Sequence, residues 1–122
     1  LKGKSFNDAI DLVTAELKKE GFGILTEIDV KETLKSKIDV DFKKYKILGA
    51  CNPHFAYEAL QSEDKIGVLL PCNVIVQEHE NGAVEISAVN PMASMSAVQN
   101  KTLGELASKV QLKLIKVINS LN

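Results

Sequence analysis

The stretch ILGACNPHFAYEAL, residues 47–60, joins a short apolar run to a helix-like pattern and decides how the neighbouring segments can fold. Residues 47–51 are apolar on both faces, which is typical of a strand buried inside a sheet. Asn52 can cap a following helix, and Pro53 suits the first turn because it has no amide hydrogen to lose there. The stretch therefore predicts a strand at 47–51 that leads directly into a helix at 53–61.

The predicted helix at 53–61 has one apolar and one polar side. Four residues are expected to point toward the core, namely Phe55, Ala56, Ala59 and Leu60. The opposite side carries His54, Tyr57, Glu58 and Gln61, which suits contact with water. This helix is therefore expected to lie on the surface of the core with one face buried.

The segment before this stretch predicts a helix, a strand and a short helix. Ser5 and Asp8 form a capping-box-like start, and an apolar stripe then runs along a helix at 6–20. Residues 22–28 replace the helical period with glycine and β-branched or apolar residues, which favours a strand. Asp29 can cap a short helix with Val30, Leu34 and Ile38 on one face, and residues 39–46 are expected to form a loop.

The segment after it predicts a hairpin and a long last helix. Apolar residues favour strands at 67–79 and 83–89, and Asn81-Gly82 is expected to form a two-residue turn in which both residues have positive φ. After a loop around Asn90-Pro91, Thr102 and Glu105 resemble a capping box. They open a predicted helix at 102–120 with eight inward positions: Leu103, Leu106, Ala107, Val110, Leu114, Val117, Ile118 and Leu121.

The length and the order of elements indicate one domain with an α+β fold. A chain of 122 residues is typical of a single domain, so residues 1–122 are expected to share one core. Helices packed on one face of a small mixed or mostly antiparallel sheet are the economical arrangement for so few strands. The fold predicted from the sequence is therefore a two-layer α+β domain.

Composition excludes several broad classes. The chain has 15 basic and 16 acidic side chains, so it lacks the positive field that nucleic acid or an anionic membrane would require. Its apolar runs are too short to span a bilayer. Two cysteines cannot form a disulfide framework, and no signal-peptide pattern is visible, so a cytoplasmic location is expected. Because the chain starts at Leu1 rather than at methionine, a segment upstream of Leu1 stays an open alternative.

Three blocks of the sequence carry a family resemblance. They are GFGILTEIDVKETLKSKIDVDFKKYKILGACNPHFAYEAL at 21–60, IGVLLPCNVIV at 66–76, and the hairpin that ends in Val89-Asn90-Pro91. Together these blocks resemble domain of unknown function 302, over nearly the whole chain. The resemblance implies a small bacterial or archaeal α+β domain, often dimeric, and brings no established activity. It therefore implies a homodimer and assigns no catalytic residue.

Two Cys-Asn dipeptides, Cys51-Asn52 and Cys72-Asn73, are the main candidate ligand-binding residues. If their strands are neighbours, the four side chains would share a site. Thiolates are soft ligands, so Cys51 and Cys72 with His54 could hold zinc or copper(I) and leave one position open. The sequence thus offers a small-molecule site and a soft-metal site at the same place.

Other features of the sequence favour a purely structural role for these residues. Cys72 alternates with Val74 and Val76, which would make it a small buried hydrophobe unless Pro71 introduces a bulge. His54 stands four residues before Glu58, a spacing that suits a surface pair on a helix. Met95 and Met92 lie in a predicted loop, where methionine either ligates a soft metal or lines an adaptable pocket.

Cys51 is also a candidate nucleophile, because a thiol just before a helix N-terminus is stabilised as thiolate by the helix dipole. Catalysis would further require a base, for which His54 and His79 are the only histidines, and an oxyanion hole. Pro53 removes one amide that could bind an anion. The function predicted is therefore a non-enzymatic small-ligand-binding module, with soft-metal binding included. The alternatives are a cysteine-dependent enzyme that uses Cys51 and a ligand-free structural or interaction module.

Overall fold

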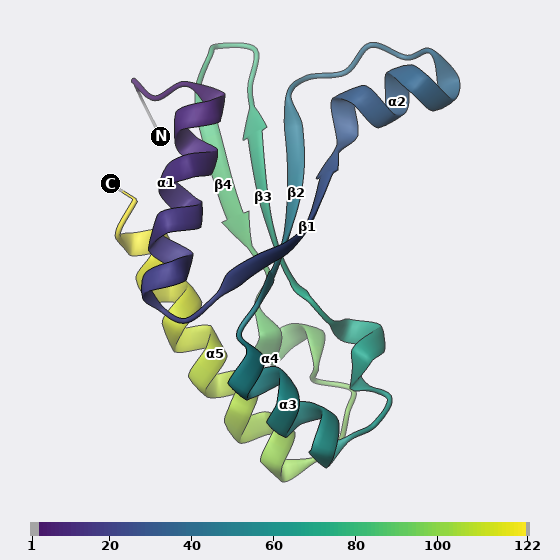
Figure 1. Ribbon diagram of the computed structural model, residues 1–122, viewed down its shortest axis with the longest axis vertical. Coiled ribbons are helices and arrows are strands. Elements are labelled where there is room, and N and C mark those ends of the chain that lie inside the picture. The colour runs from purple at the N-terminus through teal and green to yellow at the C-terminus, as the bar shows by residue number, and fades with distance from the viewer. Residues whose placement is uncertain (1–2, 122) are drawn as a thin grey trace.

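Five α-helices and a four-stranded sheet make up the fold in the computed structural model, which describes residues 3–121 (Figure 1). The elements are α1 (Phe6–Lys19), β1 (Gly23–Asp29), α2 (Val30–Ile38), β2 (Tyr45–Cys51), α3 (Pro53–Ser62), the 3-10 helix η1 (Ile66–Leu69), β3 (Cys72–Glu78), β4 (Val84–Ala88), α4 (Pro91–Ser94) and α5 (Lys101–Asn119). The strands pair in the order β1-β2-β3-β4, and every pair is antiparallel. The predicted α+β class is confirmed.

Helices α1 and α5 cover one face of this sheet (Figure 1). The apolar stripe of α1 is buried against the sheet, as predicted from its spacing: Phe6, Ala9, Ile10, Val13 and Leu17. The sheet contributes alternate residues such as Leu48, Val74 and Val76, which face the helices because successive side chains of a strand point to opposite faces. One core therefore lies between two layers.

Helix α3 extends the helical layer beyond the end of the sheet. It packs mainly on α5, and Ala59, Ile66, Leu103 and Leu106 form a second, smaller buried cluster there. The prediction that Leu60 points inward is wrong, because 43% of its side chain is exposed. The second cluster is therefore built by α3, η1 and α5 rather than by the sheet, and it lies where β2 and β3 meet the helices (Figure 1).

The predicted strand at 67–79 is wrong over its first five residues. Residues Ile66–Leu69 form η1, Val68 is 86% exposed, and β3 begins only at Cys72. The Leu70-Pro71 peptide bond is cis, and Pro71 has no amide hydrogen to donate to a neighbouring strand. From Cys72 onward the strand is regular, and Cys72 shares its face with Val74 and Val76, as the alternation predicts.

The hairpin between β3 and β4 differs from the predicted two-residue turn. The amide of Gly82 donates to the His79 carbonyl at 2.9 Å, and the amide of His79 donates to the Ala83 carbonyl at 2.8 Å. The connection is therefore a three-residue loop, in which only Gly82 has positive φ, at 84°. Asn81 instead accepts from the Ala83 amide through its side chain, a use that the sequence pattern does not distinguish from the predicted turn.

The last helix begins earlier than the predicted capping box. Asn100, rather than Thr102, is the N-cap, and its Oδ1 accepts from the Leu103 amide at 3.1 Å. The Asn100 side chain also donates to the Ser62 carbonyl at 3.0 Å, which ties the start of α5 to the end of α3. The predicted inward stripe is otherwise confirmed, with Ile118 half-buried at its edge.

Helix α2 stands apart from the rest of the fold. Asp29 caps it as predicted, but none of its residues is buried, and its main contacts are with β1, β2 and the loop before β2, where Lys31 donates to the Phe42 carbonyl. Strand β2 starts at Tyr45, two residues before the predicted boundary. Within residues 3–121, no helix combines the length and apolar character that crossing a bilayer requires.

Candidate functional site

The candidate site lies next to α3, where β2 ends at Cys51 and β3 begins at Cys72. Ala50 of β2 pairs directly with Cys72 of β3, so the two Cys-Asn dipeptides stand on neighbouring strands, as the sequence analysis required. Pro71 can lie against β2 because Gly49 has no side chain there, and a Cβ at Gly49 would come within 2.8 Å of Pro71 Cγ. The close approach of Pro71 places both strand ends at one wall of a cavity.

Asn52 links this wall to the neighbouring helices. It is the only buried polar side chain among the described residues, and its Oδ1 accepts from the Phe55 amide at 3.4 Å at the start of α3. Its Nδ2 donates to the Glu20 carbonyl at the end of α1, also at 3.4 Å. Gly21 makes room for it, since a Cβ there would approach Asn52 Nδ2 to 2.9 Å. Asn52 therefore uses both its acceptor and its donor within the protein.

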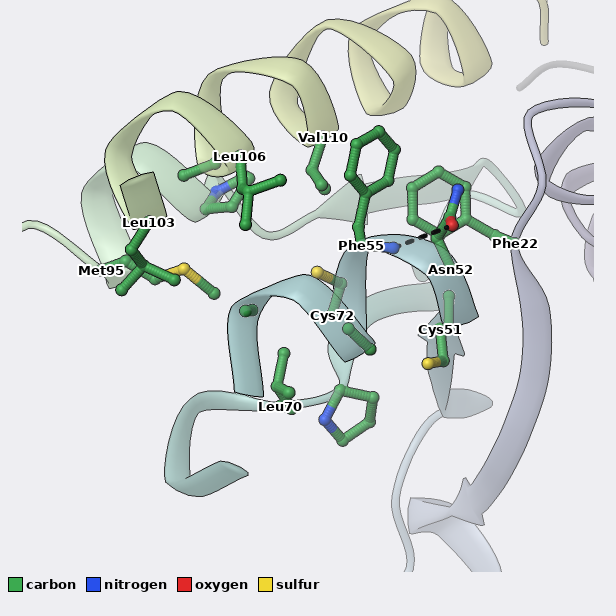
Figure 2. A pocket seen from close by; sticks show the side chains of 16 residues that line it. Phe22, Cys51, Asn52, Phe55, Leu70, Cys72, Met95, Leu103, Leu106 and Val110 are labelled. Carbon is green, nitrogen blue, oxygen red and sulfur yellow. Dashed lines mark hydrogen bonds between the residues drawn. The ribbon is translucent and has the colours of Figure 1, made fainter. Parts of the chain in front are cut away.

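A largely apolar cavity opens beside Asn52, between α3, the strand ends and α5 (Figure 2). About 40 Å³ is free for the centre of a water-sized sphere, within about 470 Å³ of empty space that includes the mouth. None of the lining residues carries a charge: Phe22, Ala50, Cys51, Asn52, Phe55, Ala56, Ala59, Leu70, Pro71, Cys72, Pro91, Met95, Leu103, Leu106, Ala107 and Val110. A charged ligand would find no opposite charge in this lining.

The far wall of the cavity comes from a distant part of the chain. The α5 side chains Leu103, Leu106 and Val110 face Phe55 across it, and Met95 enters from the segment after α4 (Figure 2). These residues are apolar, and Met95 is flexible enough to adapt to a ligand's shape. The cavity therefore exists only because α5 packs back over α3.

Both thiols at the cavity are held in their protonated form. Burial raises the pKa of the Cys51 thiol above its ordinary value of 9.0. Burial also raises the pKa of Cys72, and a thiolate at Cys51 would raise it further by repulsion. The cysteines are free, and Figure 2 shows the two sulfur atoms apart from one another. A neutral thiol is a poor nucleophile.

The remaining predicted site residues lie elsewhere. His54 is on the exposed side of α3 and does not line the cavity. Asn73 is also exposed and outside it, while its carbonyl accepts from the Val89 amide at 3.0 Å. His79 lies at the hairpin, where its Nε2 is 3.2 Å from Glu85 Oε1. Met92 is 42% exposed and does not reach the cavity.

The structure therefore does not assemble the predicted zinc or copper site. His54 is not brought to Cys51 and Cys72, and no group of three or more His, Cys, Asp or Glu side chains within residues 3–121 could hold a metal ion. The same placement leaves Cys51 without a histidine in the cavity that could act as its base. What the structure does bring together from the predicted set is Cys51, Asn52 and Cys72.

Most residues of the apolar wall could not be recognised from the sequence as part of a binding site. Phe22, Phe55, Leu103 and Leu106 read as ordinary core positions, because an apolar stripe looks the same whether it packs fully or leaves a gap. The one available signal was local: Leu70-Pro71 before Cys72 interrupts an apolar run, and this interruption marks the rim of the cavity.

Comparisons with known proteins agree with this fold. A family model described as "Domain of unknown function DUF302" matches residues 1–121. A solved structure, "Crystal structure of uncharacterized conserved protein DUF302 from Bacillus stearothermophilus", is similar with 30% sequence identity and a TM-score of 0.89, over 98% of this chain and 92% of that chain. A search of curated proteins finds no match.

Proposed function

The chain belongs to the DUF302 family, and we propose that it binds a small, uncharged, apolar molecule in the cavity beside Cys72 without transforming it. The observation that carries this proposal is the lining of the cavity, which has no charge and only one polar side chain other than the thiols. That side chain, Asn52, already forms hydrogen bonds with the start of α3 and with the end of α1. Binding must therefore come from apolar contact.

The size of the cavity limits the ligand. The enclosed space of about 40 Å³ is two to three times the roughly 15 Å³, in the same measure, that one water molecule requires. An apolar space of this kind stays poorly hydrated, so filling it with an apolar group is favourable. A short aliphatic or single-ring molecule needs more room than this, so we expect the adaptable Met95 to move aside when such a molecule binds.

The state of the thiols argues against the cysteine-enzyme alternative. Because their pKa values are raised, Cys51 and Cys72 are protonated at neutral pH and carry little nucleophilic thiolate. No histidine, lysine or carboxylate lines the cavity to remove the proton. A zinc or copper site is left out of the proposal because His54 lies outside the cavity. The cytoplasmic location stays a prediction from the sequence.

Methyl NMR with defined probes tests the proposal. Benzene, as a neutral probe, should shift the methyl signals of Leu103 and Leu106, whereas benzoate at the same concentration should not, because its charge would be desolvated without a partner. The variant Ala56→Leu fills the lined space and should abolish the benzene shifts while the fold persists. Ala97→Leu, at an exposed position outside the lining, is the matched control and should bind like the wild type.

Two outcomes would contradict the proposal. Benzene shifts that survive in Ala56→Leu would place binding elsewhere on the protein. An absence of any shift, together with no retained small molecule in native mass spectra of the purified protein, would favour the ligand-free interaction module instead.

A further inference from the structure

The cavity opens onto an exposed apolar surface. Ala56 of α3 and Leu70 both line the cavity and are only half-buried, which places them at its mouth. Leu60 follows Ala56 by one helical turn on the same side of α3. Leu69, the last residue of η1, directly precedes Leu70, and α3 and η1 are in contact. The apolar surface of the cavity therefore continues past its mouth onto α3 and η1.

We call this surface the apolar rim, made of Tyr57, Leu60, Val68 and Leu69. All four side chains are exposed, and nothing within residues 3–121 covers them. Single exposed apolar residues are ordinary, whereas adjoining ones beside a cavity mark a place where a partner binds. None of the four residues is charged, so the rim and the cavity offer one continuous surface for apolar contact.

The size of the cavity favours a ligand that extends beyond it. The enclosed space holds about two to three water molecules, whereas the empty space that includes the mouth is about 470 Å³. Apolar binding energy grows with the area removed from water, so a ligand confined to the enclosed space would bind weakly. An unbranched chain is thin enough to enter this space and long enough to continue along the rim.

The charges at the border of the rim limit the free end of such a chain. Glu63 and Asp64 lie between α3 and η1, next to the rim, and Lys65 is the only basic residue in this connection. A carboxylate or phosphate on the ligand would meet like charges here, and the cavity lining holds no cation to offset them. An uncharged end such as a hydroxyl meets no repulsion.

We infer that the bound molecule is an unbranched aliphatic chain with an uncharged end. Its first carbons fill the cavity, and the rest of the chain lies on the apolar rim. This inference rests on the proposed function, because it assigns the ligand class of the same cavity. A chain accounts for both surfaces at once, whereas a flat protein surface that covered the rim would leave the cavity empty.

Titrations of 1-butanol and 1-octanol, followed by the methyl signals of Leu103 and Leu106, test the inference. A methylene group that leaves water completely raises the association constant about fourfold, and one that is half covered on the rim raises it about twofold. The four additional methylenes of 1-octanol should therefore raise the association constant by about tenfold over 1-butanol. Octanoate at neutral pH should bind about tenfold more weakly than 1-octanol, because its carboxylate faces Glu63 and Asp64.

A variant without the rim separates its contribution from that of the cavity. Combining Leu60→Ser with Leu69→Ser should reduce the ratio of the 1-octanol and 1-butanol association constants to about two or less, because the chain beyond the mouth loses its apolar contacts. Leu112→Ser replaces a residue that is 65% exposed on α5 and should keep the wild-type ratio. The methyl spectra of both variants show whether they are folded.

The outcomes distinguish this inference from the proposed function. A ratio near one in the wild type, with benzene and 1-butanol still bound, would overturn the inference and leave the proposed function standing. If neither benzene nor 1-butanol binds, both fail. The inference is also overturned if the folded Leu60→Ser/Leu69→Ser variant keeps the wild-type ratio, or if octanoate binds as tightly as 1-octanol. A wild-type dimer that dissociates in this variant would assign the rim to a second copy of the chain instead.

Discussion

Two junctions in this molecule look alike in sequence and end in opposite surroundings. At the first, Asp29 ends β1 and caps α2, accepting from the Glu32 amide at 3.0 Å. At the second, Asn52 follows β2 and caps α3, accepting from the Phe55 amide at 3.4 Å. Both are strand ends followed by a side-chain cap, yet α2 buries no residue while α3 helps to enclose a cavity.

The difference between the two junctions shows that a cap fixes where a helix begins and leaves its packing undecided. Each cap satisfies a backbone amide that the helix itself cannot satisfy. Burial depends on whether another part of the chain presents apolar surface. Helix α3 meets Leu103 and Leu106 of α5, whereas α2 reaches out beyond the sheet and buries none of its residues.

Removing the partner of α3 should have the largest effect. Leu103 is 1% exposed and packs against α3, so Leu103→Ala is expected to lower the free energy of unfolding by about 3 kcal/mol through lost burial and an enlarged cavity. Leu112→Ala on the same helix, at a position 65% exposed, should cost under about 0.5 kcal/mol. Urea unfolding of the two variants measures both, and equal losses would show that α5 does not anchor α3.

The two caps should differ in strength when each is removed. Asn52→Ala is expected to cost about 1.5 kcal/mol, because Asn52 is buried and its loss also leaves the Glu20 carbonyl without its donor. Asp29→Ala removes an exposed cap and should cost about 0.5 kcal/mol, since water can replace it. Thermal unfolding of both variants compares them. A larger loss for Asp29→Ala would reverse the ranking of the junctions.

Alkaline pH should lower the stability of the folded protein through Cys72, which lines the cavity at the Asn52 junction. The pKa of Cys72 is higher in the folded protein than its ordinary 9.0, so below that value folded and unfolded chains carry the same protonated thiol. Above 9.0 the unfolded chain loses the proton first, and stability falls as pH rises through the folded pKa. The melting temperature of Cys72→Ala should therefore decline less steeply above pH 9.0 than that of the wild type. Identical slopes would assign the decline to other groups.

The smallest effect is expected at the end of α2. Ile38 is 64% exposed, so Ile38→Ala should change the free energy of unfolding by less than about 0.5 kcal/mol. Hydrogen exchange of the α2 amides should also be faster than that of the α3 amides in the wild type, because α2 lacks buried contacts. Equally slow exchange in α2 and α3 would mean that the two helices are equally stabilised by contacts with the rest of the protein.

Much of the fold could be predicted because its signals are local. The stripe of α1, the boundary at Cys51-Asn52-Pro53 and the inward face of α5 follow from side-chain spacing alone, and all three are confirmed. Local signals also failed where two nearby residues can do the same work. Asn100 and Thr102 both suit an N-cap. Asn100 is the cap in the structure, and its side chain also donates to the carbonyl of Ser62 at the end of α3.

The candidate site was predicted less completely than the fold. From the sequence, a shared site depended on whether the strands of Cys51 and Cys72 are neighbours, and the register shows that these strands pair. The sequence pattern left His54 as either a metal ligand or a surface residue on the polar side of its helix, and the structure places it on the exposed side, outside the cavity. The three-residue hairpin was missed in the same way, since Asn81-Gly82 fits more than one loop.

By itself, the sequence determined where the long helices and most strands lie, which residues cap α1, α2 and α3, and which faces of α1 and α5 are apolar, since these follow from backbone geometry over a few residues. Only the tertiary structure decided that α3 encloses an empty space, that α2 stays exposed and that burial raises the pKa of both thiols. The reason is physical. Apolar attraction has no direction, so an apolar stripe on a helix requires only that it be buried. Which part of the chain buries it, and how completely, depends on how the elements are connected and packed.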